Sequence, residues 1–494
     1  MKKLFFLFAA ACIIASCSKN DPFNTGQFSP DAFKKGMPLN VPVIVVPPDE
    51  DGDGDDTEEL MAAFADAEPG SVIKLLPGVY QTGVMELYGF RGKIIGAGKD
   101  KTIIIPSGPI DGSAQIDDRN LLTSWWRIIG GDLTVSDLTF KTGDGPLISD
   151  VDSYSGTQGL LVALCVNNYN ADYYPNDPPF MNFTLKNVKI SCGLFDDPSL
   201  GFYQTAYNVL MALWIGADCF WPPEEGIKLT KGNYNVTDCC FENGYDGLEF
   251  FSFGENATGI VDKIKTNNCG FGIYMTANYS SRIFITNSIF SNSTINDITI
   301  EDADWGLLYN IKSLNRCQFK LTGNKFNVSN PISSVVFRDY YVIQDQAEKW
   351  PMQAMLKGNL FSLSEGSTGI SAWNSQDIQI RNNHFAGLCD AGIIVDGQEI
   401  TLYNLDYSVM AEGTPWAKNA LILGNNFSSL KPGTAAVVLG EKSMNCTVIG
   451  TGKEKVLDLG EGNRVTGMKK VRVGHHFGPA IRDNFRMHRG MRPH

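Results

Sequence analysis

The sequence predicts an all-β fold in which short strands stack as the coils of a solenoid. A motif recurs in the second half of the chain: an apolar residue, an Asn three positions later and a Phe two positions after that. Each copy is followed by a second short apolar run, and no helical periodicity lies between the two runs. Runs this short cannot bury a face alone, so each must stack on its neighbours. The clearest copies are Leu321-Asn324-Phe326, Leu356-Asn359-Phe361, Ile380-Asn383-Phe385 and Ile422-Asn425-Phe427.

The first residues have the pattern of a secretory leader. Two lysines precede an apolar run at residues 4–14, which is too short to span a membrane, and Ala-Ser-Cys follows at 15–17. The small residue before Cys17 resembles the bacterial lipoprotein signal, which implies that residues 1–16 are removed and Cys17 is lipidated. Ser18 stands where an Asp would resemble an inner-membrane retention signal. We therefore expect an outer-membrane lipoprotein, on the cell surface or the periplasmic face; an ordinary secretory peptide that is cut elsewhere is the alternative.

Three segments follow this leader. Residues 17–40 are polar and contain Gly, Pro and Asn, which suits a flexible tether. Residues 41–465 carry the repeats and form the predicted solenoid domain. Residues 466–494 are basic, with Asp483 as their one acid, and we expect a solvated end. Docking of this tail to acidic polysaccharide or phosphate is the alternative.

The net charge limits the classes of partner. The 494 residues include 41 Lys and Arg against 54 Asp and Glu, a formal net charge of −13. A phosphate-binding face needs an excess of basic residues, so neither nucleic acid nor an anionic membrane surface is expected as the main partner. With 43% hydrophobic and 19% charged residues, the chain is not of the disordered class. We expect a monomer.

The cysteines indicate packing and not chemistry. Nine remain if Cys12 is removed with the leader and Cys17 is lipidated. They are scattered and include no C-x-x-C pair, so neither a zinc site nor a dense disulfide framework is indicated. Most should be small buried apolar side chains. Cys239 and Cys240 are adjacent and point to opposite faces of a strand, so at most one of them lies in a core.

The segment that precedes the repeats predicts a cap. Residues 52–80 contain G-D-G and D-D-T, an amphipathic helix with Leu60, Phe64 and Ala67 on one face, a strand and a P-G-x-Y turn. Together with the repeats, this segment resembles the right-handed parallel β-helix of the pectate-lyase-like superfamily, over roughly residues 50–465. The resemblance implies a short N-terminal cap helix, a polysaccharide as ligand and a substrate groove along the outside of one stacked sheet.

The Asp-rich start of the cap also has the spacing of a calcium loop. Asp49, Asp51, Asp53 and Gly54 match the EF-hand pattern, but Leu60 stands at position twelve, where a bidentate Glu is needed. The alternative is that these residues are a solvent-exposed segment leading into the cap helix. Calcium is therefore kept as a candidate cofactor, and no metal ligand is assigned.

The repeat predicts which side chains point inward. We expect each Asn to adopt the left-handed backbone region and to bond an amide of the next coil, with the Phe rings stacked inside. The second strand of each coil begins with an inward apolar residue, and the shortest spacings between these are 23 residues (370 to 393) and 25 (248 to 273). The inward residues are Leu248, Ile273, Ile298, Val335, Ile370, Ile393 and Val437.

Alternation along this second strand predicts two outward rows. Glu249 and Tyr274 belong to the first row. In the second row, Glu301, Arg338 and Asp396 are the candidate catalytic residues, around Trp373. Arg338 suits a uronate carboxylate or the role of a lyase base, and the carboxylates suit acid–base work or calcium. The alternative is a surface ladder of salt bridges. The second row runs Phe251, Thr276, Glu301, Arg338, Trp373, Asp396, Gly440.

Insertions add aromatic residues to one flank of this face. The extra residues of the longer coils fall at 302–318, 340–353 and 397–418, always after the same strand. Insertions on one face of a repeat array often mark a binding face. Exposed rings beside carboxylates suit sugar stacking, whereas packing of the loops onto the solenoid is the alternative. The candidate substrate-binding residues are Glu249, Tyr274, Trp373, Trp305, Trp350 and Trp416.

Several catalytic motifs are absent from the sequence. No G-H-G, G-x-S-x-G or H-E-x-x-H occurs, and only His384 of five His lies within the solenoid. Two hypotheses therefore stay open. The protein is either a lyase or hydrolase that acts on an acidic polysaccharide, or a non-catalytic glycan-binding or adhesive solenoid.

Overall fold

The three-dimensional description rests on a computed structural model of the chain. It describes residues 41–48, 54–108, 110–111, 124–143, 148–149, 160–167, 180–193, 209–216, 230–251, 253–276, 281–302, 317–339, 353–403, 409–432, 434–450 and 454–471. Cys17, Trp305, Trp350 and the three aspartates of the possible calcium loop lie outside these residues.

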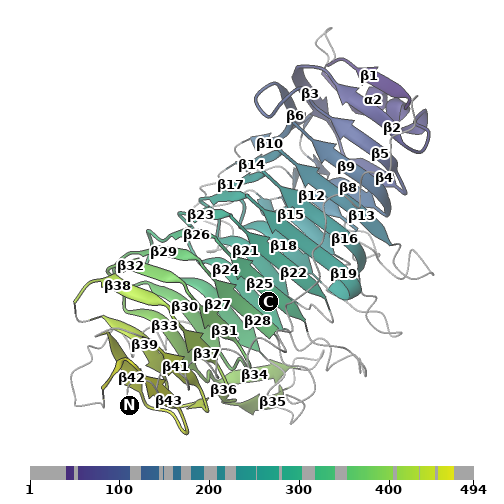
Figure 1. Cartoon of the computed structure of the whole chain (residues 1–494). Helices are drawn as coiled ribbons and strands as arrows, with labels where there is room; N and C mark the ends of the chain where they lie inside the picture. Colours follow the sequence, from purple (N-terminus) through teal and green to yellow (C-terminus); the bar gives the residue numbers. More distant parts are fainter. Residues whose placement is uncertain are drawn as a thin grey trace. The chain divides into compact units, whose positions relative to one another are not determined.

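Three long parallel sheets make up the described part of the chain (Figure 1). The 14-stranded sheet consists of β1 (Val43–Val46), β2 (Ser71–Leu75), β5 (Arg91–Ile95), β9 (Gly131–Ser136), β13 (Met181–Lys186), β16 (Thr230–Thr237), β19 (Phe253–Asp262), β22 (Arg282–Thr286), β25 (Gln318–Thr322), β28 (Gln353–Lys357), β31 (Gln379–Arg381), β37 (Leu421–Leu423), β41 (Thr447–Ile449) and β43 (Arg464–Thr466). The 11-stranded sheet consists of β3 (Gly78–Thr82), β6 (Thr102–Pro106), β10 (Thr139–Gly143), β14 (Lys189–Cys192), β17 (Cys240–Glu242), β20 (Lys265–Asn267), β23 (Ile289–Ser291), β26 (Lys325–Asn327), β29 (Leu360–Leu363), β32 (His384–Gly387) and β38 (Asn426–Leu430).

The third sheet carries the predicted site. The 13-stranded sheet consists of β4 (Met85–Tyr88), β8 (Ser124–Ile129), β12 (Leu160–Val166), β15 (Val209–Gly216), β18 (Asp246–Phe251), β21 (Phe271–Thr276), β24 (Asn296–Asp302), β27 (Ser333–Asp339), β30 (Thr368–Trp373), β33 (Ala391–Asp396), β39 (Ala435–Leu439), β42 (Lys455–Asp458) and β44 (Lys469–Val471). Three small pairs complete the strands: β7 (Ile110–Asp111) with β11 (Ile148–Ser149), β34 (Ile400–Tyr403) with β35 (Val409–Gly413), and β36 (Ala417–Lys418) with β40 (Ser443–Met444).

From β2 to β39 each coil contributes one strand to each long sheet, so strands that follow one another within a sheet belong to successive coils. All pairings within the three long sheets are parallel, as between β18 and β21 and between β21 and β24. A parallel connection in one sheet is right-handed in almost every known case. The fold is thus a right-handed parallel β-helix, which confirms the fold predicted from the repeat. The last strand, β44, extends the solenoid to Val471, beyond the predicted boundary at 465.

The predicted cap helix is α2 (Thr57–Ala65). Its buried face is formed by Leu60, Ala63 and Phe64, so Leu60 and Phe64 have the predicted orientation. Ala67 follows the end of the helix and is partly buried against the core. Among the described residues, no helix combines the length and apolar character needed to cross a membrane.

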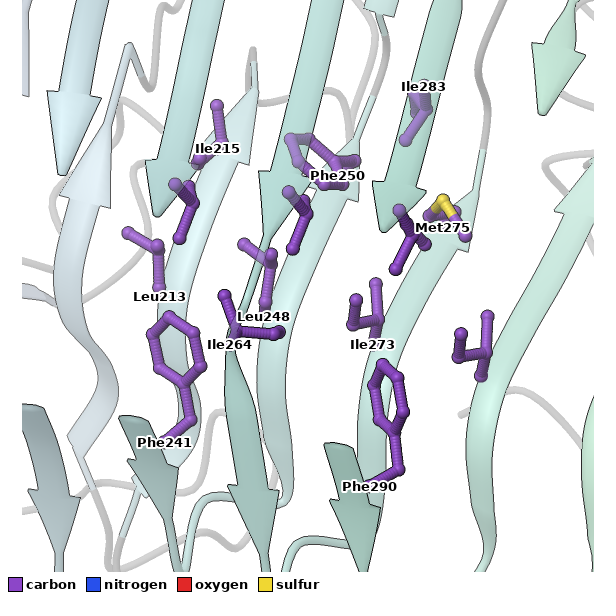
Figure 2. Close-up of a cluster of buried hydrophobic side chains, with 14 of the residues drawn as sticks. Leu213, Ile215, Phe241, Leu248, Phe250, Ile264, Ile273, Met275, Ile283 and Phe290 are labelled. Atoms are coloured by element: carbon purple, nitrogen blue, oxygen red, sulfur yellow. The ribbon is translucent and has the colours of Figure 1, made fainter. Parts of the chain in front are cut away.

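The interior contains the predicted ladders. The Phe rings stack on successive coils, with ring centroids 5.1 Å apart for Phe290 and Phe326, then 4.6, 4.7 and 4.9 Å along the column to Phe427. Figure 2 shows the neighbouring part of the core, where Leu213, Leu248 and Ile273 lie side by side on adjacent strands. All seven predicted inward residues have no exposed surface.

The Asn ladder exists, but the backbone prediction for it was wrong. The Asn359 Oδ1 accepts from the backbone N of Asn324, and its Nδ2 donates to the Asn383 Oδ1, at 2.9 Å in both cases. The ladder residues themselves do not have positive φ. The residue before each one does, namely Gly323, Gly358, Asn382 and Gly424. The left-handed residue turns the chain, which leaves the next Asn side chain directed inward.

The described cysteines match their predicted role. Cys239 is buried and Cys240 is half-buried, so one of the adjacent pair lies in the core, as expected. Burial raises the pKa of the Cys239 thiol to about 12. None of the cysteines in the described ranges forms a disulfide.

Candidate functional site

The candidate site is the outer face of the 13-stranded sheet. The predicted second row is in register, because Glu301 pairs with Arg338, Arg338 with Trp373, and Trp373 with Asp396. The first row is also in register, with Glu249 opposite Tyr274. The outward positions follow from the inward ones, since side chains alternate along a strand.

Three side chains of this face form a hydrogen-bonded line. The Arg338 Nη1 donates to the Glu301 Oε1 at 2.6 Å, and the Tyr274 hydroxyl donates to the Glu301 Oε2 at 2.9 Å. The side chains of Arg338 and Glu301 are 20% and 14% exposed, so the pair is partly shielded but still reaches solvent. Charge-assisted bonds in such a setting are stronger than fully exposed ones. Glu301 therefore orients both Tyr274 and Arg338.

Asp396 does not join this line. Three coils separate Glu301 from Asp396 along the row, which corresponds to about 14 Å between their backbones. The three predicted catalytic residues therefore do not converge on one centre, although they share a row. Register placed them correctly on one face but says nothing about whether their side chains can meet.

The carboxylate of Asp396 is engaged with the backbone. Its Oδ1 accepts from the backbone N of Gly397 and of Lys442, both at 2.8 Å, and the residue is 7% exposed. Burial raises the pKa of Asp396 to about 6. The Lys442 Nζ lies 4.9 Å from the ring centroid of Trp416. Lys442 therefore contacts Asp396 through its backbone and Trp416 through the end of its side chain.

Glu249, predicted to contact substrate, is buried beside Asp246. The two residues are 3% and 4% exposed, and Glu249 donates a hydrogen bond to Asp246. Burial raises the pKa of both carboxyls, and the proximity of Asp246 raises that of Glu249 further. The pair therefore retains a proton near neutral pH. Glu249 is therefore closed off from solvent, which argues against the predicted direct contact with substrate.

The outer face extends to coils that the sequence analysis did not include. The first row continues upstream through Trp214 and Cys165 to Arg127 and Glu86. The Arg127 Nη1 lies 2.8 Å from the Glu86 Oε1. Arg127 is 3% exposed. The sequence could have indicated this upstream part of the face, because Arg127 is a charged residue that stands between Trp126 and Ile128 in a mostly apolar strand.

The arrangement favours binding of a carboxylate by Arg338 over the use of Arg338 as a base. The bond to Glu301 stabilises the charged guanidinium, and arginine keeps its proton in proteins. A guanidinium carries five N–H donors and matches carboxylate geometry. Trp373, half-buried on the next coil, presents an aromatic ring. In the described ranges, no cluster of three His, Cys, Asp or Glu side chains is arranged to hold a metal ion.

Comparisons with known proteins identify no family for this chain. No protein-family model and no curated protein sequence matches the chain. Solved structures of similar fold include the mannuronan C-5 epimerase A-module of Azotobacter vinelandii, which is 14% identical, covers 86% of this chain and 95% of its own, and has a TM-score of 0.43.

A family PL6 polysaccharide lyase from Pseudopedobacter saltans is 12% identical, with 89% and 94% of the two chains covered and a TM-score of 0.48. A family 28 exopolygalacturonase from Yersinia enterocolitica is 12% identical, with 88% and 77% covered and a TM-score of 0.35. At these identities and TM-scores, the likenesses do not bear on the chemistry of this chain. The protein is identified by its own strand order and register as a right-handed parallel β-helix.

Proposed function

We propose that this protein binds an acidic polysaccharide along the outer face of the 13-stranded sheet and acts on it there. The observation that carries the proposal is the line from Tyr274 through Glu301 to Arg338, in partly exposed positions. In this proposal Arg338 binds the carboxylate of a uronate residue, and Trp373 on the next coil stacks against a sugar ring. The polymer then runs parallel to the row, across successive coils.

Of the two cleavage reactions, elimination suits this arrangement better than hydrolysis. Hydrolysis by two carboxyl groups requires them about 5 to 10 Å apart, whereas three coils separate Glu301 from Asp396. In an elimination, a proton leaves carbon 5 of the uronate and its electron pair forms a double bond to carbon 4. The bond from carbon 4 to the glycosidic oxygen breaks, and that oxygen takes a proton. Glu301 and Tyr274 share a hydrogen bond, and we assign to them the uptake and return of these protons.

A screen of uronate polysaccharides tests this function. An eliminating enzyme releases a product whose new double bond absorbs ultraviolet light, whereas a hydrolase produces reducing ends without that absorbance. We expect absorbance to appear with an acidic polysaccharide and not with a neutral one. Tyr274→Phe should remove it, because the phenyl ring has no proton to transfer, while binding is kept. Activity that is unchanged in both Tyr274→Phe and Arg338→Ala would overturn the assignment of the site.

A non-catalytic glycan-binding or adhesive solenoid is the second candidate. The observation that favours it is the satisfied state of the acids: Glu301 accepts from two side chains, and the Asp396 Oδ1 accepts from two backbone amides. Binding of a uronate polymer, lost in Arg338→Ala, without any product from any tested polymer, would identify this second function.

The proposal includes attachment to a membrane through Cys17. It is supported by the leader pattern and by the tether-like composition of residues 17–40. On this basis we propose a monomeric outer-membrane lipoprotein that meets its polysaccharide at the cell surface or the periplasmic face. Cys17→Ser should abolish incorporation of a labelled fatty acid and release the protein from membranes. A protein that stays membrane-bound in this variant would contradict the proposed anchor.

A further inference from the structure

A groove follows the corner where the 14-stranded sheet turns into the 11-stranded sheet. It has a volume of about 730 Å³ and extends over five successive coils, from β5 to β20. Six lysines and four acidic residues line it. It is therefore net positive in a chain whose net charge is −13. The lysines are Lys93, Lys99, Lys186, Lys189, Lys263 and Lys265.

These lysines occur in pairs on alternate coils. One pair flanks the turn from β13 to β14, and another lies at the turn from β19 to β20. The coil between them presents Cys240, which is paired with Lys189 on one side and with Lys265 on the other. Two coil steps correspond to about 10 Å. Positive charge therefore repeats along the groove at a fixed interval, as a linear polyanion requires.

The lysines differ in what they contact. Lys189 lies 2.8 Å from the Glu242 carboxylate, and this contact raises the pKa of Lys189. The Lys99 Nζ donates to the backbone oxygen of Asp238. Lys93, Lys186 and Lys265 have no ion pair within the described part of the chain. Three charges, one from each lysine-bearing coil, are thus available to an external anion.

Two of the four acids of the groove are engaged with other side chains. The Asp137 Oδ1 accepts from the Asn187 Nδ2 at 2.6 Å, and Glu242 is held by Lys189. The remaining lining includes hydroxyl groups of Thr134 and Ser136 but no aromatic side chain. Single-stranded nucleic acids are bound by aromatic platforms on which bases stack. Amines, hydroxyls and amides without such platforms suit a polymer that carries carboxylates and hydroxyl groups.

We propose that this groove is a second binding site for an acidic polysaccharide, separate from the outer face of the 13-stranded sheet. Lys93, Lys186 and Lys265 contact carboxylates about two coils apart on one extended chain. The inference rests on the proposed function for the class of ligand and adds a place where a polymer is retained. Because Lys186 and Lys265 are exposed and Lys93 is half-buried, their charges are screened by dissolved ions, and binding here depends strongly on salt.

The test compares two triple variants of the full chain. Lys93→Gln/Lys186→Gln/Lys265→Gln removes the three groove charges. Lys357→Gln/Lys431→Gln/Lys455→Gln removes three exposed lysines elsewhere and is the matched control. Affinity is measured for oligogalacturonate and oligomannuronate at several salt concentrations. We expect the groove variant to bind roughly tenfold more weakly at low salt, with a shallower salt dependence, and the control to match the wild type.

Lysine acetylation with mass spectrometry locates the contact. Oligouronate should protect Lys186 and Lys265 from acetylation and leave Lys357 unprotected. Equal affinity of the groove variant and the wild type, or absence of this protection, would overturn the groove site. Tighter binding of a single-stranded oligonucleotide of equal charge would overturn the class of ligand.

Arg338→Ala in the same assays separates the two proposals. If Arg338→Ala weakens binding and the groove variant does not, the proposed function stands and the groove fails. If the groove variant weakens binding and Arg338→Ala has no effect on either binding or cleavage, the groove stands and the proposed site fails.

Discussion

The interior of the solenoid and the outer face of its 13-stranded sheet are built from the same strands but follow different rules. Inside, each coil repeats its predecessor: Phe361 stacks 4.6 Å from Phe326 and 4.7 Å from Phe385, and Asn359 bonds Asn324 and Asn383 in the same way. Outside, equivalent positions on successive coils carry Thr276, Glu301, Arg338, Trp373 and Asp396. Repetition of the same side chains therefore stabilises the fold, and departure from repetition marks the face to which we assign the proposed function.

The difference also separates stability from function. An interior side chain contacts the coils on both sides of its own, so its removal weakens the packing of both neighbours. An outer side chain contacts few partners, and its loss mainly removes an interaction with a ligand. Five substitutions test this division, in order of decreasing expected effect.

Asn359→Ala should destabilise the protein by roughly 3 to 5 kcal/mol. The change removes the bonds of the Asn359 side chain to Asn324, Asn383 and the Leu321 carbonyl oxygen, and it leaves buried polar groups without partners. Denaturant unfolding measures the loss. Asn327→Ala, exposed on the preceding coil, is the control and should cost less than about 0.5 kcal/mol. Equal effects of the two changes would contradict the structural role of the ladder.

Arg338→Ala should weaken binding of an acidic oligosaccharide by about 1.5 to 3 kcal/mol, because it removes a charge-assisted bond to a carboxylate. Isothermal titration with a uronate oligomer measures the change. Arg282→Ala, exposed on the 14-stranded sheet, removes the same charge elsewhere and should bind as the wild type does. If both variants lose affinity equally, the effect is one of net charge and not of the row.

Asp246→Asn should stabilise the protein by about 1 to 2 kcal/mol at neutral pH. Burial raises the folded-state pKa of Asp246 above its unfolded value, so the folded state binds more protons than the unfolded one. Stability is therefore lost as the pH rises from about 4 through neutrality, and Asn, which does not ionise, avoids this loss. Thermal unfolding at several pH values measures the gain. Asp132→Asn, at an exposed position, is the control and should show no such pH-dependent gain in stability. If the stability difference between Asp246→Asn and the wild type did not change with pH, the buried Asp246–Glu249 pair would be contradicted.

Trp373→Ala should weaken sugar binding by about 1 kcal/mol, roughly fivefold, because it removes an aromatic platform. The test uses acidic and neutral oligosaccharides of equal length, since stacking does not require charge. Phe180→Ala, an exposed ring directly before β13 of the 14-stranded sheet, is the control. A loss confined to acidic sugars would mean that Trp373 acts through Arg338 and not by stacking.

Asp396→Asn should change binding and cleavage by less than about 0.5 kcal/mol. An Asn oxygen can still accept from the backbone N of Gly397 and Lys442. Because burial raises the pKa of Asp396 to about 6, the neutral Asn should also cost no stability at pH 7. The free energy of unfolding and the rate of product release are measured on the same preparation of the variant and compared with the wild type. Loss of product release in a stably folded variant would restore Asp396 to the catalytic site.

The repeat made much of this structure predictable. Seven inward residues, the Phe column, the Asn ladder and both outward rows follow from one motif and the alternation of side chains along a strand. The upstream rows were not predicted, because the motif is degenerate there and Arg127 lies in an apolar strand. Register also could not reveal the burial of Glu249, since burial depends on all the groups packed around a residue and not on its parity.

The sequence by itself determined that the chain forms stacked coils. An Asn and a Phe at a fixed spacing find a hydrogen-bond partner and a stacking partner only in a neighbouring coil that repeats the same motif. It also determined which residues share the outer face. Only the tertiary structure decided which of them interact: Arg338 binds Glu301 at 2.6 Å, while Asp396 turns to the backbone of Lys442. The lysine groove is likewise a tertiary feature, since Lys93, Lys186 and Lys265 come together only when alternate coils stack. The Asn and Phe ladders follow from a motif that repeats along the chain. A binding site depends instead on distances between side chains of different coils, and no single residue of the sequence specifies those distances.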